Sequence, residues 1–177
     1  MNETIVIKHL WKTENVVVGY KYYRQSKNSY RVTDLVYKIS GTVFLVLGVC
    51  NLIFLLNLNF GSLFLIGSGI FLLLRNKINL LYFIHKCKQL KYENKQLEWE
   101  ISEDKIVYRM LNLLETTLNW ELIKGILDTP EGFLIFPHPN TYYWLPKSAF
   151  NNEADIAHFV FIAQDKVKNW QQIKSSQ

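Results

Sequence analysis

The sequence is poor in the residues that build disulfide frameworks and metal sites. Its two cysteines, Cys50 and Cys87, form no CxxC motif, and its four histidines are scattered without ligand spacing. A disulfide, a zinc site or a cofactor is therefore not expected. Charge is missing from one long stretch, because residues 41–74 contain no Asp, Glu, Lys, Arg or His.

Recognisable catalytic motifs are missing as well. The chain has no Gly-rich phosphate loop, no HExxH and no Ser, His and Asp arrangement in a motif context. Acidic residues cluster at 98, 100, 103 and 104, but alternating carboxylates on an edge strand typically form a solvated face that discourages edge pairing. We therefore expect that the protein is not an enzyme.

The uncharged stretch is too long for a single membrane span, since the hydrocarbon core takes roughly 20 helical residues. Asn57, Asn59, Gly61 and Ser62 supply turn chemistry near its middle. The sequence therefore predicts a transmembrane helical hairpin over 35–85 with its turn at 57–62. The alternative, a buried hairpin of a soluble protein, is disfavoured because such helices carry a charged face.

Charge is distributed unevenly along the chain. Residues 1–95 carry 13 Lys and Arg against 4 Asp and Glu, whereas residues 96–177 carry 7 against 11. Because the cations flank the hairpin, the positive-inside rule predicts cytoplasmic N- and C-termini. No cleavable signal peptide is expected before the spans. We expect no nucleic-acid partner, since the bilayer surface competes for these cations, and specific headgroup binding stays an alternative.

Small and polar residues inside the spans predict how the two helices pack. Antiparallel pairing about the predicted turn brings Gly48 against the small residues at 67–69, which allow close backbone approach. It also brings Asn51 within hydrogen-bond distance of Ser68. The second helix is expected to pass Arg75 and leave the membrane near residue 85. The predicted packing residues are Gly48, Asn51, Gly67, Ser68 and Gly69.

The segments next to the hairpin show weaker patterns. Residues 1–34 are predicted to form a cytosolic strand at 4–10 and a tyrosine-rich amphipathic helix that begins near Thr13. That helix lies at the membrane interface or packs on the folded domain, and the sequence leaves both open. Residues 86–96 are predicted to be a basic linker.

From Leu97 the apolar pattern changes to a period of two. Six short strands are predicted, at 97–102, 105–111, 116–121, 123–129, 133–138 and 142–147. Asn151 or Asn152 is expected to cap a final helix from 153 to 173. An antiparallel sheet closed by one C-terminal helix predicts a pleckstrin-homology-like (PH-like) domain over 97–177. The fold class is thus a two-helix membrane hairpin plus a small α+β cytosolic domain.

Three motifs in this region carry a family resemblance. They are Asn119-Trp120, the Phe133–Phe136 strand, and Leu145-Pro146-Lys147-Ser148-Ala149-Phe150 before the final helix. With the two-span hairpin, these motifs resemble the YcxB-like bacterial membrane proteins. The resemblance implies a bacterial inner-membrane protein with a PH-like C-terminal domain and no assigned catalytic activity.

The signature residues themselves have expected roles. Pro146 is expected to end a strand, Phe150 to dock the start of the helix on the sheet, and Trp120 to pack in the core. Lys147 is the one signature residue expected to be able to contact a ligand.

These features favour a membrane-anchored interaction module with a protein partner besides the lipid bilayer. Tyr142, Tyr143 and Trp144 are the candidate partner surface, because Tyr and Trp dominate interface hot spots; the alternative is that they are ordinary strand residues. Other functions stay open: an immunity-type protein against a delivered toxin, or an accessory subunit of a membrane transport or secretion complex. Homo-oligomerisation also stays open.

Overall fold

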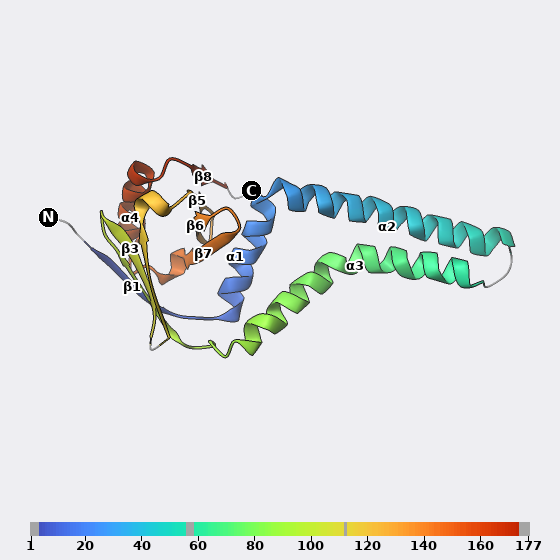
Figure 1. Cartoon of the computed structure of the whole chain (residues 1–177), viewed down its shortest axis with the longest axis horizontal. Coiled ribbons are helices and arrows are strands. Elements are labelled where there is room, and N and C mark those ends of the chain that lie inside the picture. The colour runs from blue at the N-terminus through green and yellow to red at the C-terminus, as the bar shows by residue number, and fades with distance from the viewer. Residues whose placement is uncertain (1–3, 56–58, 112, 174–177) are drawn as a thin grey trace. The chain divides into compact units, whose positions relative to one another are not determined.

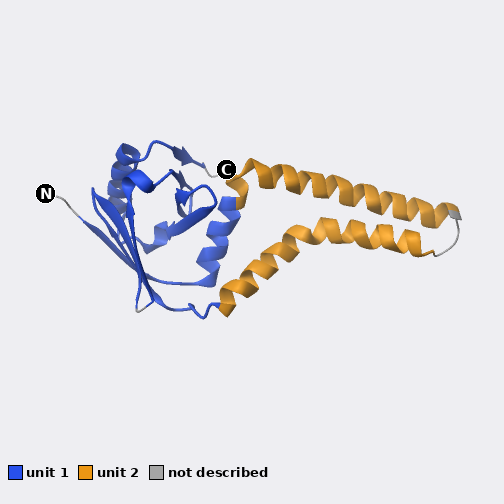
Figure 2. Ribbon diagram, in the orientation of Figure 1, with its two compact units in different colours: residues 1–23, 90–177 blue, residues 24–89 orange. Residues whose placement is uncertain are grey.

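The computed structural model describes residues 4–55, 59–111 and 113–173. The chain divides into two compact units: residues 1–23 with 90–177, called the sheet unit below, and residues 24–89, called the hairpin unit (Figure 2). The segments before and after the hairpin therefore fold together. The unit boundaries at 23/24 and 89/90 differ from the sequence boundaries at 34/35 and 85/86.

The hairpin unit contains helix α2, Asn28–Leu55, and helix α3, Phe60–Gln89. Both are long and apolar enough to cross a bilayer, and only 11% and 6% of their most apolar windows are buried. The core helix of a soluble protein would be mostly buried, so this exposure suggests membrane association. α3 continues past Arg75, whose guanidinium carbon lies 3.8 Å from the centre of the Tyr37 ring.

The turn between the helices is shorter than the predicted 57–62. Asn57 and Leu58 lie outside the described residues, whereas Phe60–Ser62 form the start of α3. Asn59 Oδ1 accepts a hydrogen bond of 2.8 Å from the Ser62 backbone N–H, which is the role of a helix N-cap. Residue types that signalled a turn thus begin a helix instead.

The first sheet of the sheet unit is antiparallel and has the order β1-β2-β3-β4. Its strands are Ile5–Leu10, Gln96–Ile101, Lys105–Met110 and Leu114–Asn119. Ile7, Trp99 and Ile106 are buried on its inner face. β1 precedes the hairpin and β2 follows it, so this sheet joins the two ends of the hairpin through backbone hydrogen bonds.

The second sheet has the order β7-β6-β5-β8. Its strands are β5, Gly125–Asp128; β6, Gly132–His138; β7, Thr141–Pro146; and β8, Trp170–Gln172. β8 corrects the sequence prediction, which extended the last helix to 173. Helix α4 runs from Glu153 to Lys166, and Val167 is extended and buried. The chain then pairs with β5 in parallel, so the sheet is not wholly antiparallel.

Figure 1 shows the strands and helices of the sheet unit as ribbons, and aromatic contacts between them define its layers. On one face of the second sheet, the Tyr143 ring lies 5.3 Å from that of Tyr108 in the first sheet. On the same face, Phe133 lies 4.7 Å from Phe159 of α4. Helix α1, Thr13–Ser26, covers the opposite face through Tyr23, which packs against Leu134. Of the two placements left open for this helix, the one on the folded domain is observed.

Candidate functional site

The ammonium group of Lys147 forms hydrogen bonds within the sheet unit. It begins the 3-10 turn Lys147–Ala149 that follows Pro146 at the end of β7. Its Nζ donates hydrogen bonds of 2.7 Å to Asp128 Oδ1 and 2.8 Å to the Thr129 carbonyl oxygen. Lys147 is therefore engaged in contacts within the protein, and its contact with a ligand stays a prediction.

Asp128 is the partner that sequence reasoning missed. Its side chain is only 7% exposed, and its second carboxylate oxygen accepts a 3.2 Å hydrogen bond from Gln172 Nε2 in β8. A buried carboxylate requires such compensation, because removing it from water is costly. The one signal in the sequence is an acidic residue at the end of an otherwise apolar strand, and it does not identify Lys147 as the partner.

The other signature residues are internal. The Phe150 ring lies 6.1 Å from that of Phe133 and 5.9 Å from that of Phe159, so it anchors the start of α4 on the second sheet. Trp120 is 4% exposed, and its Nε1 donates a 2.9 Å hydrogen bond to the Ser102 carbonyl. Asn152 Oδ1 caps α4 by accepting from the Asp155 backbone N–H.

The three aromatic residues predicted as a partner surface are covered by the protein itself. Tyr142 stacks on Tyr23 of α1 at 4.7 Å, and Trp144 stacks on Tyr22 at 6.1 Å. Tyr143 points the other way, toward the first sheet. β7 lies between α1 and the first sheet, so all three side chains are partly buried by contacts within the protein. Their binding to a partner stays a prediction.

A cavity of about 270 Å³ opens beside Trp144, between α1, the β5–β6 turn and the turn after β7. Its walls are half apolar and half polar, and Asn15, Glu131, Lys147 and Ser148 supply the polar groups. The Glu131 carboxylate accepts a 3.1 Å hydrogen bond from the Tyr22 hydroxyl. Burial and this neighbouring carboxylate raise the pKa of Tyr22. The lining residues are Asn15, Val18, Pro130, Glu131, Trp144, Pro146, Lys147 and Ser148.

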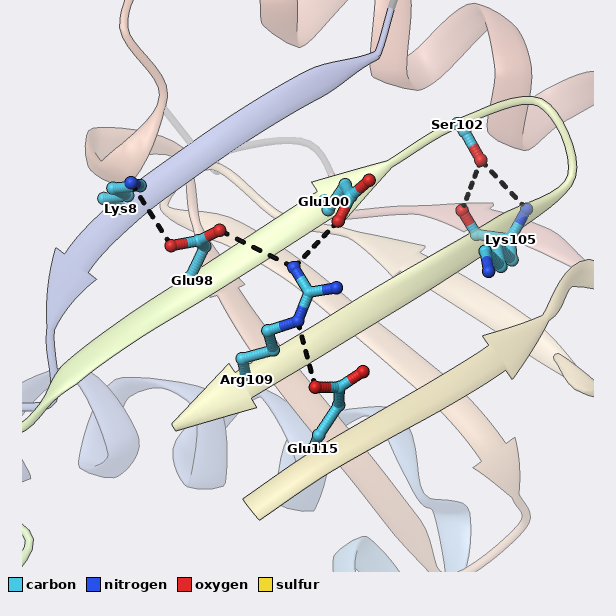
Figure 3. A network of polar contacts seen from close by, with 7 residues as sticks. All are labelled: Lys8, Glu98, Glu100, Ser102, Lys105, Arg109 and Glu115. Carbon is cyan, nitrogen blue, oxygen red and sulfur yellow. Dashed lines mark hydrogen bonds and ion pairs between the residues drawn. The ribbon is translucent and has the colours of Figure 1, made fainter. Parts of the chain in front are cut away.

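The outer face of the first sheet carries an ion-pair network centred on Arg109 (Figure 3). Its guanidinium lies 2.8 Å from Glu100, 3.2 Å from Glu115 and 3.6 Å from Glu98. Hydrogen bonds to these carboxylates raise the pKa of Arg109. The predicted acidic face is thus neutralised in part by a cation. Its strand is not an edge strand as expected, because β1 pairs with it.

In the hairpin unit, the small residues meet in a different register from the predicted one. A Cβ atom at Gly69 would lie 2.8 Å from the Gly41 carbonyl oxygen, and a Cβ at Gly48 would lie 2.7 Å from Cγ1 of Ile66. Around Gly67 there is open space, with no described heavy atom within 4 Å of a Cβ built there. The expected contact of Gly48 with residues 67–69 is therefore wrong.

Asn51, the polar residue inside α2, also has a partner in a different register from the predicted one. Asn51 Oδ1 accepts a 3.0 Å hydrogen bond from Ser62 Oγ, in place of the bond predicted with Ser68. The physical reason is that Asn59 caps α3 and is not the centre of the turn. The partner of Asn51 therefore lies six residues earlier in α3 than predicted, which is more than one helical turn.

Among the described residues, no group of three or more His, Cys, Asp or Glu side chains could hold a metal ion. Comparison with known proteins identifies one segment: residues 101–160 match the family described as YcxB-like protein. This segment is similar to the YcxB-like proteins. The family resemblance predicted from the sequence is confirmed over these residues, which include Trp120, Lys147 and Phe150. No curated protein and no solved structure shows a significant match to the chain.

The matched segment runs from the end of β2 into α4. The match therefore covers the Asp128–Lys147 ion pair and the Phe150 anchor. It leaves out β1, α1 and β8, although these elements belong to the same compact unit.

Proposed function

We propose that this chain is a non-enzymatic bacterial inner-membrane protein whose sheet unit is a membrane-anchored module that binds another protein. The observation that carries the proposal is the pairing of β1 with β2, because these strands flank the apolar hairpin in the sequence. The pairing is extended by a 2.8 Å hydrogen bond from the Trp11 N–H to the Lys95 carbonyl. The two apolar helices are thus an insertion in the sequence of one folded unit.

This pairing also supports the membrane topology. If α2 and α3 cross the bilayer, strands that share a sheet must lie on the same side of it. The cations that flank the hairpin favour the cytoplasm as that side. Both termini are then cytoplasmic, and the short connection between the helices faces the opposite side.

The order of elements supports a PH-like arrangement for the cytoplasmic part. Antiparallel strands β2 to β7 are followed by the single helix α4. In this proposal β1, α1 and β8 are additions that link the PH-like core to the hairpin and complete its sheets.

The cavity beside Trp144 is the proposed contact site, in place of the covered aromatic residues. Its volume of about 270 Å³ suits one protein side chain better than a small-molecule ligand. Val18, Pro130 and Pro146 offer apolar walls, and Glu131 offers a carboxylate. A Lys or Arg side chain of a partner has the matching chemistry, because it combines an aliphatic stem with a cationic tip.

Site-specific photo-crosslinking in native membranes tests this proposal. A photo-reactive residue at Ser148, on the rim of the cavity, should form a protein adduct, whereas one at the exposed Glu103 in the β2–β3 turn should not. Val18→Phe fills the cavity and should remove the adduct. Lys21→Phe places the same ring on an exposed position of α1 and should leave it unchanged. An adduct that forms equally at both positions, or that survives Val18→Phe, contradicts the site.

The immunity-type function and the accessory-subunit function stay predictions, since no contact described above favours either. The absence of catalysis and the homo-oligomeric state also stay predictions.

A further inference from the structure

The turn between β3 and β4 exposes leucine side chains. Leu111, Leu113 and Leu114, called the leucine turn below, are 59%, 53% and 50% exposed. Leu111 and Leu113 lie in the turn itself, and Leu114 is the first residue of β4. Turns between strands are usually built from Gly, Asn, Asp, Ser and Pro, so exposed leucines at this position need an explanation. Contiguous exposed apolar side chains typically mark a contact with a protein or a membrane.

Backbone hydrogen bonds place the leucine turn at one end of the first sheet. The Leu111 N–H donates to the Gln96 carbonyl at 3.1 Å, and Gln96 pairs with Leu10. Leu10 is itself 46% exposed. This is the end at which the chain enters the sheet unit after α3 stops at Gln89. The leucines thus lie at the end of the sheet that is tethered to the hairpin.

The charged residues at this end are mostly basic. Lys12, Lys91 and Lys95 are exposed. Of the acidic residues nearby, Glu93 accepts hydrogen bonds from the Thr13 backbone and hydroxyl, and Glu115 pairs with Arg109. The three lysines thus lie in the segments that enter and leave the first sheet at the end that carries the leucines. Apolar side chains flanked by lysines are the composition that binds anionic membrane surfaces.

We infer that the leucine turn inserts into the cytoplasmic headgroup region of the bilayer, where Lys12, Lys91 and Lys95 face anionic lipid phosphates. This inference rests on the proposed function, because it requires α2 and α3 to anchor the chain in the membrane. It gives the sheet unit a lipid contact in addition to its two covalent links to the hairpin.

Depth-dependent quenching in proteoliposomes tests the inference. The full chain with Cys50→Ala and Cys87→Ala is reconstituted in vesicles of phosphatidylcholine and phosphatidylglycerol and labelled with an environment-sensitive fluorophore at single new cysteines. Leu113→Cys reports on the leucine turn. Glu103→Cys reports on the β2–β3 turn at the other end of the same sheet. Phe64→Cys, on a 62% exposed position of α3, reports on the hairpin.

The expected result is a blue-shifted emission and quenching by a shallow nitroxide lipid at 113, quenching by a deep nitroxide lipid at 64, and neither at 103. Quenching at 64 without quenching at 113 overturns the lipid contact and leaves the membrane anchoring intact. Absence of quenching at both 64 and 113 overturns both proposals. Loss of the 113 signal in vesicles of phosphatidylcholine alone would show that the anionic lipid is required, as the lysines predict.

Discussion

Lys147 shows how a residue that looks like a binding group can be structural. Its ammonium group lies 2.7 Å from a buried carboxylate and 4.9 Å from the centre of the Phe133 ring. The pair links the start of the turn after β7 to the end of β5. Gln172 adds β8 to the same carboxylate, so three segments distant in sequence meet at Asp128.

Removing the cation should therefore destabilise the sheet unit. In Lys147→Met, the buried carboxylate of Asp128 keeps only the hydrogen bond from Gln172 to offset its loss of hydration. We therefore expect the free energy of unfolding to fall by about 3 kcal/mol. Urea unfolding followed by tryptophan fluorescence measures this loss. Lys166→Met, which removes an exposed pair with Asp165, should cost less than about 1 kcal/mol. Equal effects of the two substitutions would refute the structural role of Lys147.

His9 should make the stability of the sheet unit depend on pH. Burial lowers the pKa of His9 from 6.5, and its Nδ1 is buried with no hydrogen-bond partner among the described residues. The unfolded chain therefore binds a proton at a higher pH than the folded chain does. The free energy of unfolding should fall as the pH drops through 6.5, and it should level off below the folded pKa.

The variant His9→Leu should lose less stability than the wild type between about pH 7.5 and about pH 5.5. Thermal unfolding at the two pH values measures the difference. His138→Gln changes an exposed histidine and should keep the pH dependence of the wild type. If His9→Leu also keeps the pH dependence of the wild type, then the burial of His9 does not contribute to that dependence.

At the scale of elements, α4 depends on the ring that precedes it. Phe150 is 9% exposed between Phe133 and Phe159. Phe150→Ala should cost about 3–5 kcal/mol in the free energy of unfolding, because it leaves a cavity under the start of the helix. Phe161→Ala, at a 73% exposed position of α4, should change stability by no more than about 0.5 kcal/mol. Chemical denaturation of the detergent-solubilised chain compares the two.

The hairpin offers a matched pair of glycines on one helix. Gly69→Ala should separate α2 from α3, because its new methyl group would lie 2.8 Å from a backbone oxygen of Gly41 that cannot move alone. Gly67→Ala meets open space, and the better helix propensity of Ala should make it neutral or slightly stabilising. Unfolding in increasing dodecyl sulfate measures both. The opposite order would restore the register predicted from the sequence.

At the scale of the whole molecule, the pairing of β1 with β2 joins the two segments that flank the hairpin. In the proposed topology both segments therefore lie on the same side of the membrane. A reporter that is active only in the periplasm should be active when fused at Asn59 and inactive when fused at Lys91. The reverse pattern would contradict the topology. Equal activity at both positions would contradict the two-span hairpin itself.

Local patterns in the sequence were sufficient to predict most of the helices and strands. The length of the apolar run predicted two helices, and alternation predicted strands that lie within a few residues of β1 to β7. The Asn cap of α4 and the YcxB-like signature were also readable. These features depend on the preferences of residues for their neighbours in sequence, namely periodicity, caps and the length of an apolar segment.

Tertiary structure decided which elements meet. It joined β1 to β2 across the hairpin, returned β8 to β5, and covered Tyr142 and Trp144 with α1. It also engaged Lys147 with Asp128. These contacts depend on the burial of whole faces and on compensation of a buried charge, both of which involve residues far apart in the chain. A change in helix register leaves the local patterns intact and still changes every contact between the two helices.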